Sequence, residues 1–190
     1  MSTIIILMKE TLLAFIDTET TGLNPNVHEI IELALIVCKQ VSVAGRGPKI
    51  EIVKEYEWKI KPSRLDLAEE DALRINGYNE TDWMFAYDLR PVMEEFAKAT
   101  QSCTFVSHNL AFDYPFVMNA FKKSDVDSKM HYAKIDTISV AFARLYDVPQ
   151  ATAFSLRALC ELFKVDNAKA HTALADTRAL VAVYKKMMNA

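Results

Sequence analysis

Four carboxylates and one histidine, spread over three separated segments, are the side chains whose types and order predict chemistry. Asp17 and Glu19 follow one apolar run, and Asp113 follows another. His171 and Asp176 stand near the C-terminus. Carboxylate oxygens are the ligands that Mg²⁺ and Mn²⁺ prefer. With a histidine beside them, these acids predict metal-assisted hydrolysis of a phosphodiester bond.

The first acid pair is expected on one face of a strand. Asp17 and Glu19 are two residues apart at the end of an apolar run, and strand side chains with this spacing emerge on the same side. Their like charges repel, and a cation between them removes that penalty. An acidic turn that binds no metal is the alternative interpretation. Asp113 has an alternative too, because an acid in the first turn of a helix is stabilised by the helix dipole.

The C-terminal pair, His171 and Asp176, does not fit one face of a continuous helix. The two residues are five positions apart, which on a helix turns their side chains about 140° away from each other. We therefore expect His171 to lie before the helix or in a loose first turn. Such a position suits a base that engages only when substrate is bound. A solvated side chain is the alternative for His171.

Apolar periodicity and turn residues predict an α/β fold with five strands. The strands are expected at residues 12–17, 30–38, 50–60 and 104–107, with a short one around Ile135. A hairpin-type turn is expected at residues 45–48. The helices are expected at residues 68–75, 90–99, from near Pro115 to about 122, after Asp136, 156–163 and 172–187, with Asp136 and Ser155 as N-caps. Three early strands followed by alternating helices and strands predict a mixed five-stranded sheet flanked by helices.

Length and charge limit how the chain can bind nucleic acid. The 190 residues fit a single domain over positions 1–190, with a formal net charge of −3. Proteins that track a long duplex usually present a basic face. A mildly acidic chain fits better with gripping a few terminal nucleotides through bound metal ions. The net charge therefore argues against a protein that binds processively along a duplex groove, but it does not argue against a nuclease.

Cysteine spacing and hydropathy favour an intracellular setting. Cys38, Cys103 and Cys160 show no close spacing, so we expect them to be reduced and buried. No apolar stretch approaches the roughly 20 residues that span a bilayer. We therefore expect a soluble, cytoplasmic protein with no membrane partner. His28 and His131 are expected to face solvent.

The motifs resemble those of the DEDDh 3′–5′ exonucleases, a family that includes the proofreading subunit of bacterial DNA polymerase III. Three stretches occur in the family's order: Asp17-Thr18-Glu19-Thr20-Thr21-Gly22, His108-Asn109-Leu110-Ala111-Phe112-Asp113 and His171-Thr172-Ala173-Leu174-Ala175-Asp176. The resemblance covers residues 12–184 and includes the neighbouring stretches Gly22-Leu23, Glu29-Ile30-Ile31-Glu32, Asp136-Thr137 and Ser155-Leu156-Arg157-Ala158-Leu159.

This resemblance implies a ribonuclease H-like fold and catalysis with two Mg²⁺ or Mn²⁺ ions. Asp17 would bridge the two ions. Glu19 and Asp176 would hold the ion that carries the attacking water, and Asp113 would support the second ion. His171 would remove the proton of the water, while the ions stabilise charge on the leaving 3′ oxygen.

The resemblance also implies where the substrate binds. The substrate would be the 3′ end of DNA, preferably single-stranded, and the product a nucleoside 5′-monophosphate. Aromatic faces stack bases without reading sequence, which such an enzyme needs. The residues expected to place the terminal nucleotide are Thr20, Thr21, Gly22, Leu23, His108, Asn109 and Phe112.

Other functions stay open on sequence alone. The chain fits a 3′–5′ exoribonuclease acting on short RNA, or a catalytically silent nucleic-acid-binding subunit, although the five intact residues argue against lost chemistry. Because Ala190 closes the chain beside the last helix, with no evident clamp-binding peptide, a standalone nuclease is favoured over a replicase subunit. A separately encoded DNA polymerase could still dock on the folded surface. Replication, repair and RNA processing are equally open, and Ile4–Leu7 could pair with a partner chain.

Overall fold

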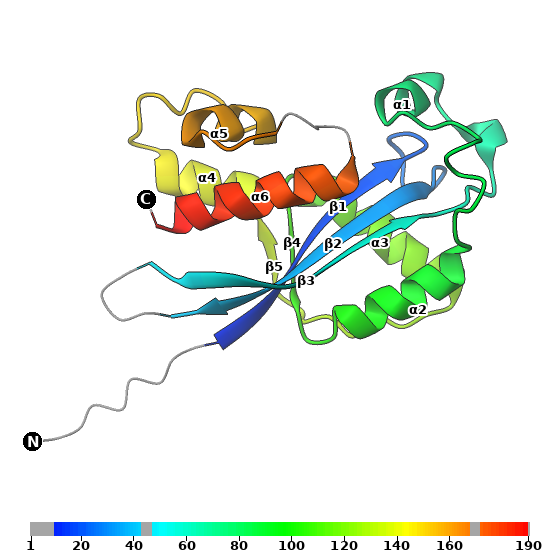
Figure 1. Ribbon diagram of the computed structural model, residues 1–190, viewed down its shortest axis with the longest axis horizontal. Coiled ribbons are helices and arrows are strands. Elements are labelled where there is room, and N and C mark those ends of the chain that lie inside the picture. Colours follow the sequence, from blue (N-terminus) through cyan, green and yellow to red (C-terminus); the bar gives the residue numbers. More distant parts are fainter. Residues whose placement is uncertain (1–9, 43–46, 168–171, 190) are drawn as a thin grey trace, which may run out of the picture.

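A computed structural model describes residues 10–42, 47–167 and 172–189. The Ile4–Leu7 segment, Gly45 and Arg46 of the expected turn, and His171 therefore lie outside the described residues. Five strands form one mixed sheet with helices on both faces, which confirms the expected fold class (Figure 1).

The strands follow the expected apolar runs and extend beyond most of them. In the sheet they lie in the order β3-β2-β1-β4-β5. The first three are antiparallel neighbours, whereas β4 and β5 run parallel to β1. The central strand β1 continues past Asp17, so both acids of the first motif lie inside it. The bounds are β1 (Glu10–Thr20), β2 (Ile30–Val41), β3 (Lys49–Lys59), β4 (Thr104–Ser107) and β5 (Lys134–Asp136).

The helices also lie close to their expected positions. Asp136 accepts backbone N–H groups of Ile138 and Ser139, and Ser155 accepts that of Ala158, which confirms both N-caps. The bounds are α1 (Glu70–Ile75), preceded by a 3₁₀ turn (Leu65–Leu67), α2 (Leu89–Ala99), α3 (Leu110–Ser124), α4 (Thr137–Leu145), α5 (Leu156–Phe163) and α6 (Ala173–Met188).

The start of α3 differs from the expectation, because Pro115 lies inside the helix rather than near its beginning. Asn109 adopts a left-handed conformation with φ of 70°, which turns the chain directly after β4. Asparagine tolerates this conformation better than most residues. The Leu110 N–H then donates to Asp136 at 3.2 Å, so the helix begins at once. Pro115 therefore predicted that a helix lies in this region but not where the helix begins.

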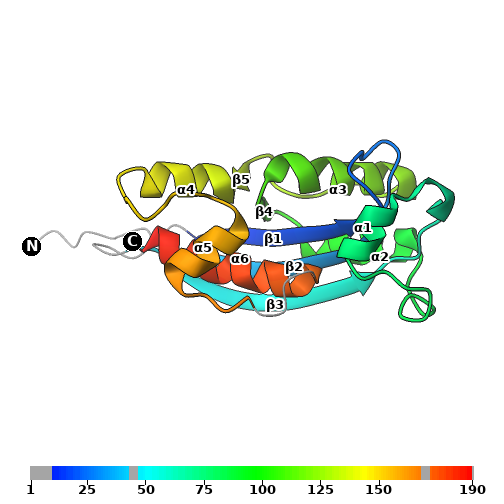
Figure 2. The same ribbon diagram turned by 90° about the horizontal axis from the view of Figure 1, so that it is seen from above.

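Two hydrophobic cores sandwich the sheet. Ala14 and Ile16 of β1 face α2 and α3, whereas Leu13 and Phe15 face α4, α5 and α6. Figures 1 and 2 show these two helical layers on opposite sides of the sheet. Because strand side chains alternate, Asp17 continues the row of Leu13 and Phe15. The first motif therefore points to the side of the sheet that α6 covers.

Of the remaining expectations, those for the cysteines and for His131 are confirmed and the one for His28 is wrong. The three cysteines are buried and free, as expected, and His131 is exposed, as expected. The expectation for His28 is wrong, since its side chain is only 7% exposed. Among the described helices, no stretch is both long and apolar enough to cross a bilayer.

Candidate active site and metal centre

Three acids from two elements meet at the end of β1. Asp17, Glu19 and Asp176 offer carboxylate oxygens that all lie within 4.8 Å of one another. The first two come from β1, and Asp176 comes from the first turn of α6. Figure 1 shows the start of α6 beside the end of β1. Residues that are far apart in the sequence thus share one small volume.

Burial and mutual repulsion raise the pKa values of the two strand acids, Asp17 and Glu19. The pKa of Asp17 lies well above its usual range, first because the group is desolvated and then because Asp113 and Glu19 are near. Burial, followed by repulsion from Glu32 and Asp176, raises the pKa of Glu19 to about 8. A divalent cation relieves such repulsion, and an all-carboxylate donor set suits Mg²⁺ or Mn²⁺. The residues present therefore fit the metal that the fold family implies.

Asp113 is adjacent to this cluster but is held differently. Its side chain is 2% exposed, and its Oδ1 accepts the backbone N–H of Thr18 at 3.1 Å and the Thr18 hydroxyl at 2.8 Å. Burial raises the pKa of Asp113 to about 7, although the bonds from Thr18 oppose the rise. Asp113 therefore joins α3 to β1 at the residue between Asp17 and Glu19.

The loop after β1 is held by its own hydroxyl groups. Thr20 donates its hydroxyl to the Gly22 carbonyl at 2.7 Å. Thr21 donates its N–H to the Glu29 carbonyl and accepts the Glu29 N–H on its hydroxyl, both at 2.9 Å. Leu23 lies in this loop with 72% of its side chain exposed. The threonines thus shape the loop, and Leu23 is an apolar side chain that the loop presents outward.

Gly22 lies against the imidazole ring of His28, and its lack of a side chain leaves room for that ring. A Cβ atom on Gly22 would overlap the imidazole ring of His28, so only glycine fits there without a shift. His28 accepts the Asn24 N–H on Nδ1 at 3.0 Å, and its Nε2 lies 3.6 Å from Glu69. The ring therefore fills the inside of the loop instead of facing solvent.

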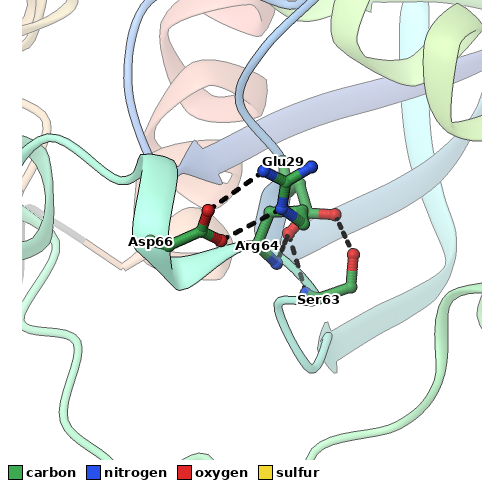
Figure 3. Close-up of polar contacts among 4 residues, drawn as sticks. All are labelled: Glu29, Ser63, Arg64 and Asp66. Carbon is green, nitrogen blue, oxygen red and sulfur yellow. Dashed lines mark hydrogen bonds and ion pairs between the residues drawn. The ribbon is translucent and has the colours of Figure 1, made fainter.

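A segment after β3 clamps this loop from outside. Glu29 accepts the Ser63 N–H at 2.8 Å, the Ser63 hydroxyl at 2.6 Å and the Arg64 N–H at 2.9 Å, while Arg64 pairs with Asp66 (Figure 3). Further along, the amide of Asn76 donates to the Thr20 carbonyl at 3.0 Å. The loop backbone next to the acids is thereby fixed by residues up to 56 positions away.

The first residue of the second motif lies in a cleft that contains two of the acids. His108 lines this open cleft of about 620 Å³ together with Asp17 and Asp176. Its Nδ1 lies 3.0 Å from the Thr137 hydroxyl, and burial lowers the pKa of His108. Asn109 is exposed, and Phe112 is half-buried with its ring 5.1 Å from that of Phe116. The first two residues of the motif therefore differ, since His108 is partly buried and Asn109 is solvent-facing.

Three residues around the acids were not singled out by the sequence. Asn167 donates to Asp176 Oδ1 at 3.2 Å, and Asn76 holds the loop as described. Glu32 is 3% exposed and accepts the Ala173 N–H at 3.1 Å. Burial and the nearby Glu57 raise the pKa of Glu32 to about 7. An acid inside the apolar run of β2 was a usable signal for Glu32, because buried acids are rare without a partner. His171 lies outside the described residues.

Comparison with known proteins matches this chain to nucleases. A family model described as "Exonuclease" (RNase_T) matches residues 14–184. The chain is 31% identical over 175 residues to DNA polymerase III subunit epsilon of Rickettsia typhi, covering 89% of this chain and 70% of that protein. It is 30% identical over 174 residues to a PolC-type DNA polymerase III of Thermotoga maritima, covering 91% of this chain but 12% of that protein.

A solved structure shares the fold. The crystal structure of Escherichia coli Exonuclease I in complex with a dT13 oligonucleotide superposes with a TM-score of 0.75 at 18% identity. The match covers 93% of this chain and 40% of that chain. The chain thus spans less than half the length of this structural relative, and the likeness concerns the fold, which is that of ribonuclease H-like exonucleases.

Proposed function

The chain belongs to this exonuclease family, and from that membership we propose that it is a metal-dependent 3′–5′ exonuclease. It removes nucleoside 5′-monophosphates from the 3′ end of DNA, preferably single-stranded. The observation that carries the proposal is the meeting of Asp17, Glu19 and Asp176 within 4.8 Å. Three partly buried carboxylates so close together repel one another, and a cation site is the function that makes use of this arrangement.

The acids would hold Mg²⁺ or Mn²⁺, with Asp17 shared between two ions. Glu19 and Asp176 would hold one ion, and Asp113 would support the second from its place beside Thr18. When bound, the ions supply positive charge at the scissile phosphate and lower the pKa of water. Asp113 also keeps the strand backbone between Asp17 and Glu19 in place.

His171 acts as the general base in this proposal. It stands two residues before the first residue of α6, and Asp176 lies in the first turn of the same helix. The neutral imidazole accepts the proton of the attacking water, whose oxygen then bonds to phosphorus as the 3′ oxygen leaves. Only the unprotonated form of His171 can do this, so activity rises with pH through the titration of the histidine.

The loop after β1 and the start of α3 place the terminal nucleotide. Leu23 presents an exposed apolar side chain, and Phe112 presents a half-buried aromatic ring. Contacts of this kind grip a base without reading its identity. Thr20, Thr21 and Gly22 support the same loop, and His108 and Asn109 line the approach from β4. A nuclease that must accept every base needs this lack of selectivity.

Two findings support DNA as the substrate. The relatives named above are a DNA polymerase III subunit epsilon and a PolC-type DNA polymerase III, at 31% and 30% identity, and the solved relative holds a dT13 oligonucleotide. RNA is the competing substrate, since the acids themselves do not discriminate the sugar. A DNA polymerase is the partner that these names suggest.

The test uses single-stranded DNA, duplex DNA and RNA of equal length, each labelled at the 5′ end. We expect a ladder that shortens from the 3′ end, fastest on single-stranded DNA, with release of mononucleotides that requires Mg²⁺ or Mn²⁺ and stops with EDTA. Asp17→Asn serves as the matched inactive control. Preference for RNA would make the protein an exoribonuclease. Binding without cleavage would make it a silent subunit, and internal cuts or shortening from the 5′ end would overturn the proposal.

A further inference from the structure

We propose that Glu32 is a positioning residue that holds the first turn of α6 against β2 and so sets the place of Asp176. The inference deepens the proposed function and rests on it for its catalytic consequence. Its structural part is a hydrogen bond between the buried carboxylate of Glu32 and the N-terminus of α6. This part can be tested without an activity assay.

Glu32 carries a carboxylate at a buried position, where such a group needs a compensating interaction. It lies in β2 with 3% of its side chain exposed, between apolar neighbours. A buried carboxylate without a hydrogen-bond partner costs several kcal/mol of folding free energy. Its Oε1 accepts the N–H of Ala173 at 3.1 Å, across 141 positions of sequence. This bond therefore satisfies both the acid and a backbone donor that the helix leaves open.

Two further hydrogen bonds of the described first turn are local. Thr172 accepts the Ala175 N–H on its hydroxyl at 3.3 Å and the Asp176 N–H on its carbonyl at 3.1 Å. Because Thr172 belongs to the same segment, these bonds shape the turn without placing it over the sheet. Glu32 belongs to β2, so its bond does place it. The later turns are placed by apolar packing, for example of Leu180 and Tyr184.

Fixing Ala173 fixes Asp176. The two residues are three positions apart on α6 and therefore lie on the same face of the helix. Glu32 is paired with Glu19 in the register of β1 and β2, so the anchor lies next to the acids that Asp176 must reach. A shift of the first turn would move the Asp176 carboxylate relative to Asp17 while leaving β1 unchanged.

The contact indicates an acceptor role for Glu32 rather than a ligand role. Within the described residues, the acids whose oxygens can share one cation are Asp17, Glu19 and Asp176, and Glu32 is outside this group. In this proposal α6 needs an acceptor oxygen of Glu32 within hydrogen-bond distance of the Ala173 N–H. Substitution can separate the charge of the side chain from its length, because glutamine keeps the length and aspartate keeps the charge.

The experiment compares Glu32→Gln with Glu32→Asp in the full chain. Glutamine retains an acceptor oxygen at the same distance, so we expect kcat and the Mg²⁺ midpoint of activity to stay close to the parent. Aspartate withdraws the oxygen by one methylene, so we expect kcat to fall by about 10- to 100-fold, the usual loss for a residue that orients a ligand. The Mg²⁺ midpoint should rise, and KM for DNA should not change. Glu51→Gln is the control, an exposed acid on β3 that is paired with Lys39 of β2 rather than with Glu32.

Two outcomes of the activity comparison would overturn the inference. If Glu32→Gln loses as much activity as Glu32→Asp, the carboxylate charge itself is required. If both variants behave like the parent, the anchor has no role. Amide hydrogen exchange at Ala173 tests the anchor even if the parent shows no nuclease activity, which would instead contradict the proposed function. We expect protection in the parent and in Glu32→Gln, and faster exchange in Glu32→Asp; equal exchange in all three would also overturn the anchor.

Discussion

The acid cluster has two halves that are held in different ways. Asp17 and Glu19 belong to the central strand, where backbone hydrogen bonds to β2 fix each residue in register. Asp176 belongs to the first turn of a helix, where individual side chains, Glu32 and Thr172, supply the acceptors. Substitution of a strand acid therefore removes a charge and leaves the scaffold intact. Around Asp176, by contrast, a change in a neighbouring side chain moves the acid.

The strand half gives the largest expected effect. Asp17→Asn should reduce turnover by at least about 10³-fold, since metal-ion catalysis is worth several kcal/mol of transition-state stabilisation. Without metal, the variant should be as stable as the parent or more stable, because repulsion among the acids is relieved. Steady-state rates with Mg²⁺ and thermal unfolding in EDTA measure the two effects. Asp147→Asn, an exposed acid beyond α4, is the control. Activity within tenfold of the parent would remove Asp17 from the metal site.

On the helix side, His171→Ala should lower the rate by roughly 10²- to 10⁴-fold, the usual contribution of a positioned base. Metal and DNA binding should persist, since His171 is not proposed as a ligand. The parent rate should rise with pH through the histidine titration, and the variant should lose that limb. Rate profiles between pH 5 and pH 9 measure the difference. Identical profiles in the two proteins would exclude His171 as the base.

Gly22→Ala tests whether the loop after β1 is as firmly fixed as the strand itself. The added Cβ overlaps the His28 ring, and overpacking of this kind costs about 1–3 kcal/mol. We expect a lower Tm and a higher KM for DNA with a smaller change in kcat. The double variant with His28→Ala should recover part of the loss, because the ring no longer blocks the methyl group. A single variant as stable as the parent would show that the loop adjusts freely.

The last expected effect, which concerns stability and not turnover, is a pH dependence of unfolding in the metal-free protein. Folding raises the pKa of Glu19 to about 8 and that of Glu32 to about 7, from a usual value of 4.5. The folded state therefore keeps protons that the unfolded state has released, and the free energy of unfolding falls as pH rises through this window. Unfolding in EDTA between pH 5 and pH 8 measures the trend. Mg²⁺ should oppose this fall in stability. A free energy of unfolding that stays constant with pH in EDTA would contradict the raised pKa values of Glu19 and Glu32.

The sequence predicted what depends on local pattern. Apolar runs located the strands, and Asp136 and Ser155 capped their helices as expected. It could not predict the burial of His28, because the space under Gly22 arises only when the loop folds back on itself. The roles of Asn76 and Glu32 were also missed, since their partners lie 56 and 141 positions away and no local pattern encodes such contacts.

The family resemblance placed Glu19 and Asp176 at one ion and Asp113 at the second, with Asp17 common to both. What it could not predict is that Asp113 Oδ1 accepts two hydrogen bonds from Thr18. The group that shares one small volume consists of Asp17, Glu19 and Asp176. Which oxygen atoms face one another depends on the crossing of α6 over the sheet, and that crossing is set by tertiary packing.

The central claim is that acids from β1 and from α6 form one divalent-cation site. Titration with Mn²⁺, followed by the electron paramagnetic resonance signal of the unbound ion, tests it without reference to catalysis. Asp17→Asn and Asp176→Asn should each weaken binding by about tenfold or more, because even residues that only orient a ligand are worth that much. Asp147→Asn should bind like the parent. Parental Mn²⁺ affinity in Asp176→Asn would contradict the claim, since the helix would then contribute nothing to the site.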